Sequence, residues 1–128
     1  MKQELVICVI KNSKGEFLLN KKSANHLYYP GRWCFFGGKA KSRNLKKEMI
    51  RELKEEAGIM LNPKFIFTKD ILTKKGKMKI HVFSEKINEI TKVKLGEVAG
   101  FAFFEKKELN NLKIGPDVKF MMKYLKLK

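Results

Sequence analysis

The chain has 128 residues and a formal net charge of +16, from 29 Lys and Arg against 13 Asp and Glu. This length fits one domain, residues 1–128, that buries a core without disulfide or metal staples. The hydrophobic fraction of 44% argues against a disordered chain, and the longest apolar runs are too short to span a bilayer, so no membrane partner is expected. The first residues do not resemble a secretory signal, and two cysteines in apolar segments, Cys8 and Cys34, predict reduced core thiols in a cytoplasmic protein.

The predicted elements combine short strands with two helices. A strand over 5–10, a turn at 12–15 and a strand over 16–19 form a hairpin. A short strand over 33–36 ends at Gly37 and Gly38. A helix over Leu45–Ala57 begins at an N-cap, Asn44 or Ser42, and stops at Gly58. Strands over 64–68, 77–84 and 99–104 and a helix over 116–127 complete the chain. This order predicts an α/β or α+β fold with a mixed sheet sandwiched between helices.

The first predicted helix concentrates its acidic residues on one arc. At about 100° per residue, its apolar residues form a separate stripe, and i,i+4 pairs of like charge cost a few tenths of a kcal/mol each. Two interpretations remain open: a solvated face on which Arg51 bridges to Glu48 and Glu55, or a site for Mg²⁺ or Mn²⁺, which prefer oxygen ligands. The acidic arc consists of Glu48, Glu52, Glu55 and Glu56, and the apolar stripe of Leu45, Met49, Ile50, Leu53 and Ala57.

The sequence around this helix resembles the signature of the Nudix hydrolases. Gly37-Gly38-Lys39 and the later run Arg51-Glu52-Leu53-Lys54-Glu55-Glu56-Ala57-Gly58-Ile59 carry the resemblance, and the second half of the signature is matched without a substitution. It extends to 33–38 before the helix and to 96–104 after it. In the first half, Arg43 stands where the family has an earlier Glu, and the loop is one residue shorter than the common version. The resemblance implies an α/β/α sandwich.

The same resemblance implies a reaction: metal-dependent hydrolysis of a nucleoside diphosphate linked to a further group. By position, Glu52 and Glu56 would be the main ligands of Mg²⁺ or Mn²⁺, Glu55 would complete the site, and the Gly37 carbonyl would add an oxygen. Arg51 would orient the carboxylates. The general base is Glu97 or Glu52, and Glu97 is alternatively an additional ligand or a solvated loop residue. Substrate contacts would come from Gly38, Lys39, Arg43 and Trp33, where Trp33 stacks on a base or packs in the core.

Three functions remain open. The first is a pyrophosphohydrolase of free nucleotides, and the second is a non-catalytic module that binds a nucleotide or RNA, which Arg43 and the net charge favour. The third is an RNA 5′-end pyrophosphohydrolase that uses lysines around 69–79 and along 119–128. The alternative for these lysines is a solvated basic surface. His81 is interpreted as a strand residue without a catalytic part, and oligomeric state is left open.

Overall fold

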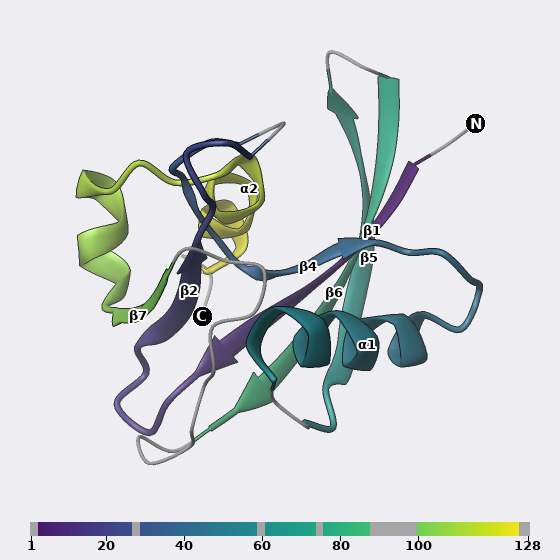
Figure 1. The fold of residues 1–128 in the computed structure, drawn as a ribbon, viewed down its shortest axis with the longest axis horizontal. Coiled ribbons are helices and arrows are strands. Elements are labelled where there is room, and N and C mark those ends of the chain that lie inside the picture. The colour runs from purple at the N-terminus through teal and green to yellow at the C-terminus, as the bar shows by residue number, and fades with distance from the viewer. Residues whose placement is uncertain (1–2, 27–28, 59–60, 74–75, 88–99, 126–128) are drawn as a thin grey trace.

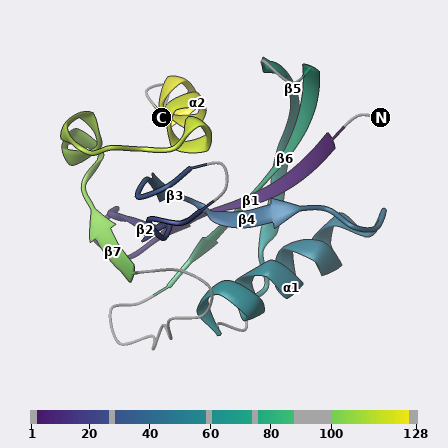
Figure 2. The ribbon, with the colours of Figure 1, turned by 45° about the horizontal axis from the view of Figure 1, so that its top comes forward.

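The structure, a computed structural model, describes residues 3–26, 29–58, 61–73, 76–87 and 100–125. Within these ranges a seven-stranded mixed sheet is covered on one face by a long helix, α1, and on the other by a second helix, α2, and a short 3₁₀ helix, η1 (Figures 1 and 2). The predicted class, a mixed sheet between helices, is confirmed. The elements are β1 (Gln3–Lys11), β2 (Phe17–Lys21), β3 (Trp33–Cys34), β4 (Phe36–Lys39), α1 (Leu45–Ala57), β5 (Lys64–Thr73), β6 (Gly76–Lys86), β7 (Gly100–Phe104), η1 (Lys106–Asn111) and α2 (Pro116–Leu125).

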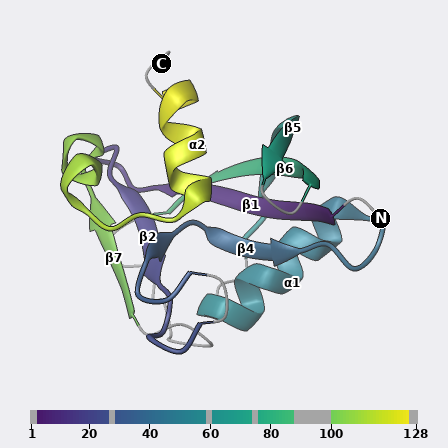
Figure 3. The same ribbon diagram turned by 90° about the horizontal axis from the view of Figure 1, so that it is seen from above.

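The first strand, β1, is the centre of the sheet. Along one edge it pairs in parallel with β6, and β6 pairs with β5 as an antiparallel hairpin. Along the other edge its first half pairs with β4, and its last residue, Lys11, pairs with Phe17 of β2. The sheet therefore branches at β1: β4 leads toward α1, whereas β2 continues to β3 and β7 (Figure 3).

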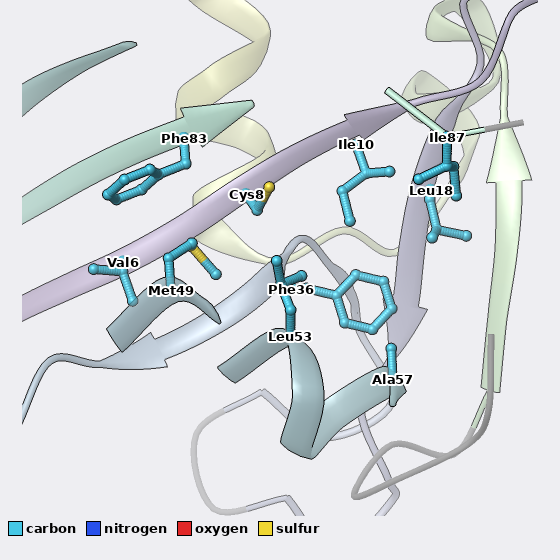
Figure 4. Close-up of a cluster of buried hydrophobic side chains, with 10 residues drawn as sticks. All are labelled: Val6, Cys8, Ile10, Leu18, Phe36, Met49, Leu53, Ala57, Phe83 and Ile87. Carbon is cyan, nitrogen blue, oxygen red and sulfur yellow. The ribbon is translucent and has the colours of Figure 1, made fainter. Parts of the chain in front are cut away.

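Alternate residues of β1 supply two hydrophobic cores, one on each face of the sheet. Val6, Cys8 and Ile10 face α1 and pack with its Met49, Leu53 and Ala57 (Figure 4). Ile7 and Val9 belong to the second core, with Val118 and Met121 of α2. The six-residue apolar run that predicted the first strand is continuous because both faces of β1 are covered.

Three boundary predictions are corrected by the structure. Gly37 and Gly38 do not end a strand. They lie inside β4, where they pair with Ile7 and Val6, because the ladder with β1 outweighs the weak strand preference of glycine. The predicted strand over 33–36 is interrupted at Phe35, and the strand predicted over 64–68 runs on to Thr73 in the β5–β6 hairpin. Helix η1 was not predicted.

Both cysteines are buried and free, as predicted. Burial raises the pKa of Cys8 to about 12 and raises the pKa of Cys34 further, so both thiols stay protonated. In the part of the chain that the structure describes, no helix has the length and apolar character needed to cross a membrane.

Candidate active site

Local sequence fixes where α1 begins and ends. The Asn44 side chain accepts a hydrogen bond from the Lys47 amide (3.1 Å), which makes Asn44 the N-cap and settles the choice against Ser42. Gly58 adopts the left-handed conformation (φ 64°), and its N–H bonds to the Leu53 and Lys54 carbonyls. The caps thus set the two ends of α1, and packing of Met49, Leu53 and Ala57 against β1 sets which face of the helix meets the sheet.

Three of the four glutamates of α1 are buried, at successive i,i+4 positions. Glu48, Glu52 and Glu56 are 5–8% exposed, whereas the side chain of Glu55 is 43% exposed. The interpretation of the acidic arc as a solvated face is therefore wrong for three residues and correct for Glu55. The apolar stripe is also narrower than predicted, because Leu45 and Ile50 are only half-buried.

Glu56 is held between a strand amide and a lysine. Its Oε1 accepts a hydrogen bond from the Gly37 N–H (2.7 Å), and its Oε2 accepts one from Lys22 Nζ (3.1 Å). Burial raises the pKa of Glu56 to about 7, while Lys22 and the Gly37 amide act in the opposite direction. The sequence did not single out Lys22: it lies 34 residues away along the chain, and a Lys after a short strand carries no local sign of a partner.

Two glycines of β4 lie where a side chain would collide with a neighbouring element. A Cβ at Gly38 would lie 2.7–2.9 Å from the carboxylate atoms of Glu52. A Cβ at Gly37 would collide with the backbone of β1, lying 2.9 Å from Ile7 Cα and closer still to the Val6 carbonyl oxygen. Glycine is needed at both positions for close approach: Gly37 against β1 and Gly38 against the Glu52 carboxylate.

Arg51 joins three of the helix glutamates. Its guanidinium donates to Glu48 (3.2 Å), Glu52 (3.0 Å) and Glu55 (3.0 and 3.1 Å). These partners raise the pKa of Arg51, with the bond to Glu48 contributing most. The predicted bridges to Glu48 and Glu55 are both present, and Glu52 is a third partner.

Glu48 fixes the loop before α1. Its Oε1 accepts a 2.5 Å hydrogen bond from the Lys41 amide, and this bond, followed by the Arg51 guanidinium, holds the pKa of Glu48 below its ordinary value. Lys39, the last residue of β4, and Lys41 and Arg43 of the loop are all exposed. Arg43 stands with Phe65 and Phe83 at a hollow of about 330 Å³ beside the start of α1.

The remaining predicted site residues are dispersed. Glu97 lies outside the described residues. Trp33 is half-buried and packs edge-on against Phe104, with ring centroids 4.9 Å apart, which favours the packing interpretation over the stacking one.

His81 is a buried residue of β6, as expected, and bonds to Thr68 and Glu4 on the neighbouring strands. Asp117 was not predicted: its carboxylate accepts from the Phe35 amide (2.9 Å) and ties α2 to the break between β3 and β4.

The carboxylate oxygens beside β4 fit a hard divalent cation as its ligands. Glu52 lies against Gly38 and Glu56 bonds to Gly37, so two carboxylates from successive turns of α1 meet β4, and a carboxylate has about four acceptor positions. A pair of carboxylates matches Mg²⁺, which takes one or two carboxylates and completes its shell with water and phosphate oxygens. Within the described ranges, no group of three or more His, Cys, Asp or Glu side chains is placed to hold a metal ion.

The sequence belongs to a known family. The family model described as the NUDIX domain matches residues 1–125. This chain is a NUDIX domain. Among curated proteins, the nucleoside triphosphatase NudI of Klebsiella pneumoniae is 31% identical over 58 residues, which are 45% of this chain and 41% of that protein. The matches to NudI proteins cover 41% to 56% of the relatives' own length, so this chain spans about half of them.

Solved structures show the same NUDIX fold. The MutT protein of Methanosarcina mazei superposes with a TM-score of 0.82 at 24% identity, covering 96% of this chain and 91% of that chain. The NUDIX domain of Shewanella oneidensis NrtR, solved in complex with ADP ribose, gives a TM-score of 0.81 at 13% identity, covering 98% of this chain and 87% of that chain. At these identities the likeness shows the fold.

Proposed function

We propose that this NUDIX domain is a pyrophosphohydrolase that acts on a nucleoside diphosphate linked to a further group, such as a nucleoside triphosphate, with Mg²⁺ or Mn²⁺ as cofactor. The observation that carries the proposal is the burial of Glu52 and Glu56 against Gly37 and Gly38. Lys22 and Arg51 each pair with one of these carboxylates, and a divalent ion would add the positive charge that two buried carboxylates on successive helical turns favour. Family membership and the nucleoside triphosphatase activity named for the NudI relative give independent support. The reduced thiols favour the cytoplasm as its location.

In this proposal each residue near β4 has one task. Glu52 and Glu56 hold the divalent ion, the Gly37 carbonyl adds an oxygen, and Glu55 supports the site through Arg51. Arg51 keeps the carboxylates in place. When bound, the divalent ion neutralises charge on the pyrophosphate oxygens.

The chain's own residues would bind the substrate and position it for attack by water. Lys39 at the end of β4 and Arg43 in the following loop, both exposed, attract the polyphosphate. Gly38, next to the Glu52 carboxylate, remains a proposed substrate contact, whereas Trp33 packs against Phe104 and is not assigned a contact with the base. Water attacks one phosphorus, the bond from that phosphorus to the bridging oxygen breaks, and two phosphate-bearing products leave. Glu52 and Glu97 are the candidates to accept the proton of the attacking water.

A panel of nucleotides tests this function. Phosphate and pyrophosphate release is measured with Mg²⁺, with Mn²⁺ and with EDTA, for the wild type, Glu52→Gln and Glu56→Gln. Each substitution should lower kcat by about a hundredfold or more, as the removal of one transition-state-stabilising group does. Asp70→Asn, at an exposed position on β5, is the matched control and should retain full activity. Turnover that survives EDTA or Glu56→Gln contradicts the proposal.

Arg43 and the charge of +16 favour a second candidate, a NUDIX domain that binds a nucleotide or RNA without cleaving it. Calorimetry separates the two. Binding that is unchanged by EDTA, together with no turnover of any nucleotide or of 5′-triphosphorylated RNA, would show that the domain is a binding module and has no hydrolase activity. Faster cleavage of the RNA end than of free nucleotides would instead identify an RNA-end pyrophosphohydrolase.

A further inference from the structure

Helices η1 and α2 lie on the face of the sheet opposite α1 (Figure 2). Residues of η1, of α2 and of the segment between them line a second hollow. It encloses about 450 Å³, within the range of sites that hold small molecules. The carboxylates of α1 are on the other side of the sheet. This hollow is therefore separate from the proposed pyrophosphate-cleaving site.

The charged residues that line this hollow are all basic. Arg32, Lys113, Lys119 and Lys123 line it, and no Asp or Glu does. Lys119 and Lys123 are four residues apart on α2, a spacing at which like charges repel. Arg32 is held in place by a hydrogen bond from its Nη1 to the Ile114 carbonyl (3.0 Å). Four cations from three segments of the chain thus surround one concave surface.

The described acidic residues of the neighbouring elements are engaged elsewhere. Glu105 and Glu108 close a capping box at the start of η1, and Glu105 also pairs with Lys107 (3.3 Å). Asp117, in the first turn of α2, bonds to the Phe35 amide. These carboxylates are not among the residues that line the hollow, so within the described ranges its cations face no acidic side chain there.

The same hollow has an apolar lining. Leu112 and Met122, both half-buried, contribute to it beside the lysines. A ligand that matches this surface carries negative charge at one end and a flat or apolar body at the other. A nucleoside phosphate has this composition: phosphate oxygens pair with lysine and arginine, and the base or sugar covers aliphatic side chains.

We propose that the hollow between η1 and α2 is a second binding site that takes a nucleoside phosphate, either as a free nucleotide or as part of a single-stranded RNA. The phosphate lies among Arg32, Lys119 and Lys123, and the nucleoside lies on Leu112 and Met122. The site binds without a divalent ion and does not cleave its ligand. It is independent of the proposed function, because no residue of the carboxylate site contributes to it.

Binding is tested in EDTA, which removes the divalent ion that turnover would need. The probes are ATP and a short 5′-phosphorylated single-stranded RNA, and binding is followed by the methyl signals of ¹³C-methionine-labelled protein and by fluorescence anisotropy. Met122 reports on the hollow and Met49, buried under α1, on the opposite face. Met122→Leu assigns the Met122 signal. The Met122 signal should shift on binding and the Met49 signal should not.

Charge reversal supplies the matched variants. Lys119→Glu/Lys123→Glu removes two cations of the hollow, and Lys64→Glu/Lys69→Glu makes the same change in net charge at exposed positions of β5. The first should weaken binding by about tenfold or more, because each lysine–phosphate contact releases counterions. The second should weaken binding by about twofold at most, through the general field alone.

Tighter binding of the RNA than of ATP identifies single-stranded RNA as the ligand, and equal binding of the two probes identifies a free nucleotide. Equal weakening by the two double variants, an unshifted Met122 signal, or no binding of either probe in EDTA overturns the proposal. Failure of the proposed hydrolase activity would leave these results unchanged. Conversely, Lys119→Glu/Lys123→Glu should retain turnover of free nucleotides if both proposals hold.

Discussion

Titration of Glu56 should make the metal-free protein less stable as the pH rises. The carboxyl is 5% exposed, and burial raises its pKa from 4.5 to about 7 in the folded protein. In the unfolded chain the same group loses its proton near its ordinary pKa. Between these two values the folded protein therefore binds more protons than the unfolded chain. The free energy of unfolding must then fall with pH across this window and level off above it.

The size of this effect follows from the shift. One pKa unit corresponds to about 1.4 kcal/mol, so a shift from 4.5 to about 7 corresponds to about 3 kcal/mol of stability lost by pH 8. Lys22, whose side chain is 12% exposed, sets a limit to the loss, because its ammonium stabilises the ionised carboxylate. The contribution of Glu56 is present in full below about pH 4.5 and is lost as the pH passes through about 7.

Urea unfolding in EDTA measures this contribution, with Glu56→Gln as the reference. The variant leaves Lys22 without its charged partner, but that cost is constant with pH, so the slope of the difference isolates the titration. From about pH 4.5 to about pH 8, the wild type should lose about 3 kcal/mol relative to the variant. Adding Mn²⁺ at the upper pH should stabilise the wild type more than the variant. Parallel stability curves for the two proteins would refute the reasoning.

Two further substitutions test the geometry around α1. Gly38→Ala places a Cβ 2.7–2.9 Å from the Glu52 carboxylate and should weaken Mn²⁺ binding by about tenfold in calorimetry. The control is Gly100→Ala, where a Cβ meets nothing within 4 Å. Equal Mn²⁺ affinities of the two variants would contradict the prediction. Asn44→Ala should lower the free energy of unfolding by about 1 kcal/mol through loss of the N-cap, whereas Asn44→Asp should retain it; an unchanged urea midpoint for Asn44→Ala would count against the cap.

Sequence reasoning succeeded where the determining interactions are local. The bounds of α1 follow from Asn44, from the 3.6-residue periodicity and from Gly58, all within the helix or next to it. The extension of β4 through Gly37 and Gly38 could not be read in this way, because glycine disfavours strands and the pairing partner is the distant β1.

The burial of the glutamates could not be predicted from the sequence for the same reason. Helical spacing places Glu48, Glu52 and Glu56 on one face, but only tertiary structure brings Lys22 and the Gly37 amide to Glu56. An isolated helix with this sequence would solvate all four carboxylates. The resemblance to a family signature supplied the candidate site residues, and the structure adds the contacts that hold three of the carboxylates under the sheet.

The parallel pairing of β1 with β6 has a consequence for synthesis of the protein. Gln3–Lys11 leaves the ribosome well before residues 78–86, its partner along one whole edge. Until that segment emerges, the nascent chain carries an apolar strand with an open edge, the kind of surface that aggregates or recruits chaperones. The sheet is therefore expected to close only after residue 86 has left the ribosome, and slow codons downstream of that residue would help folding more than slow codons upstream.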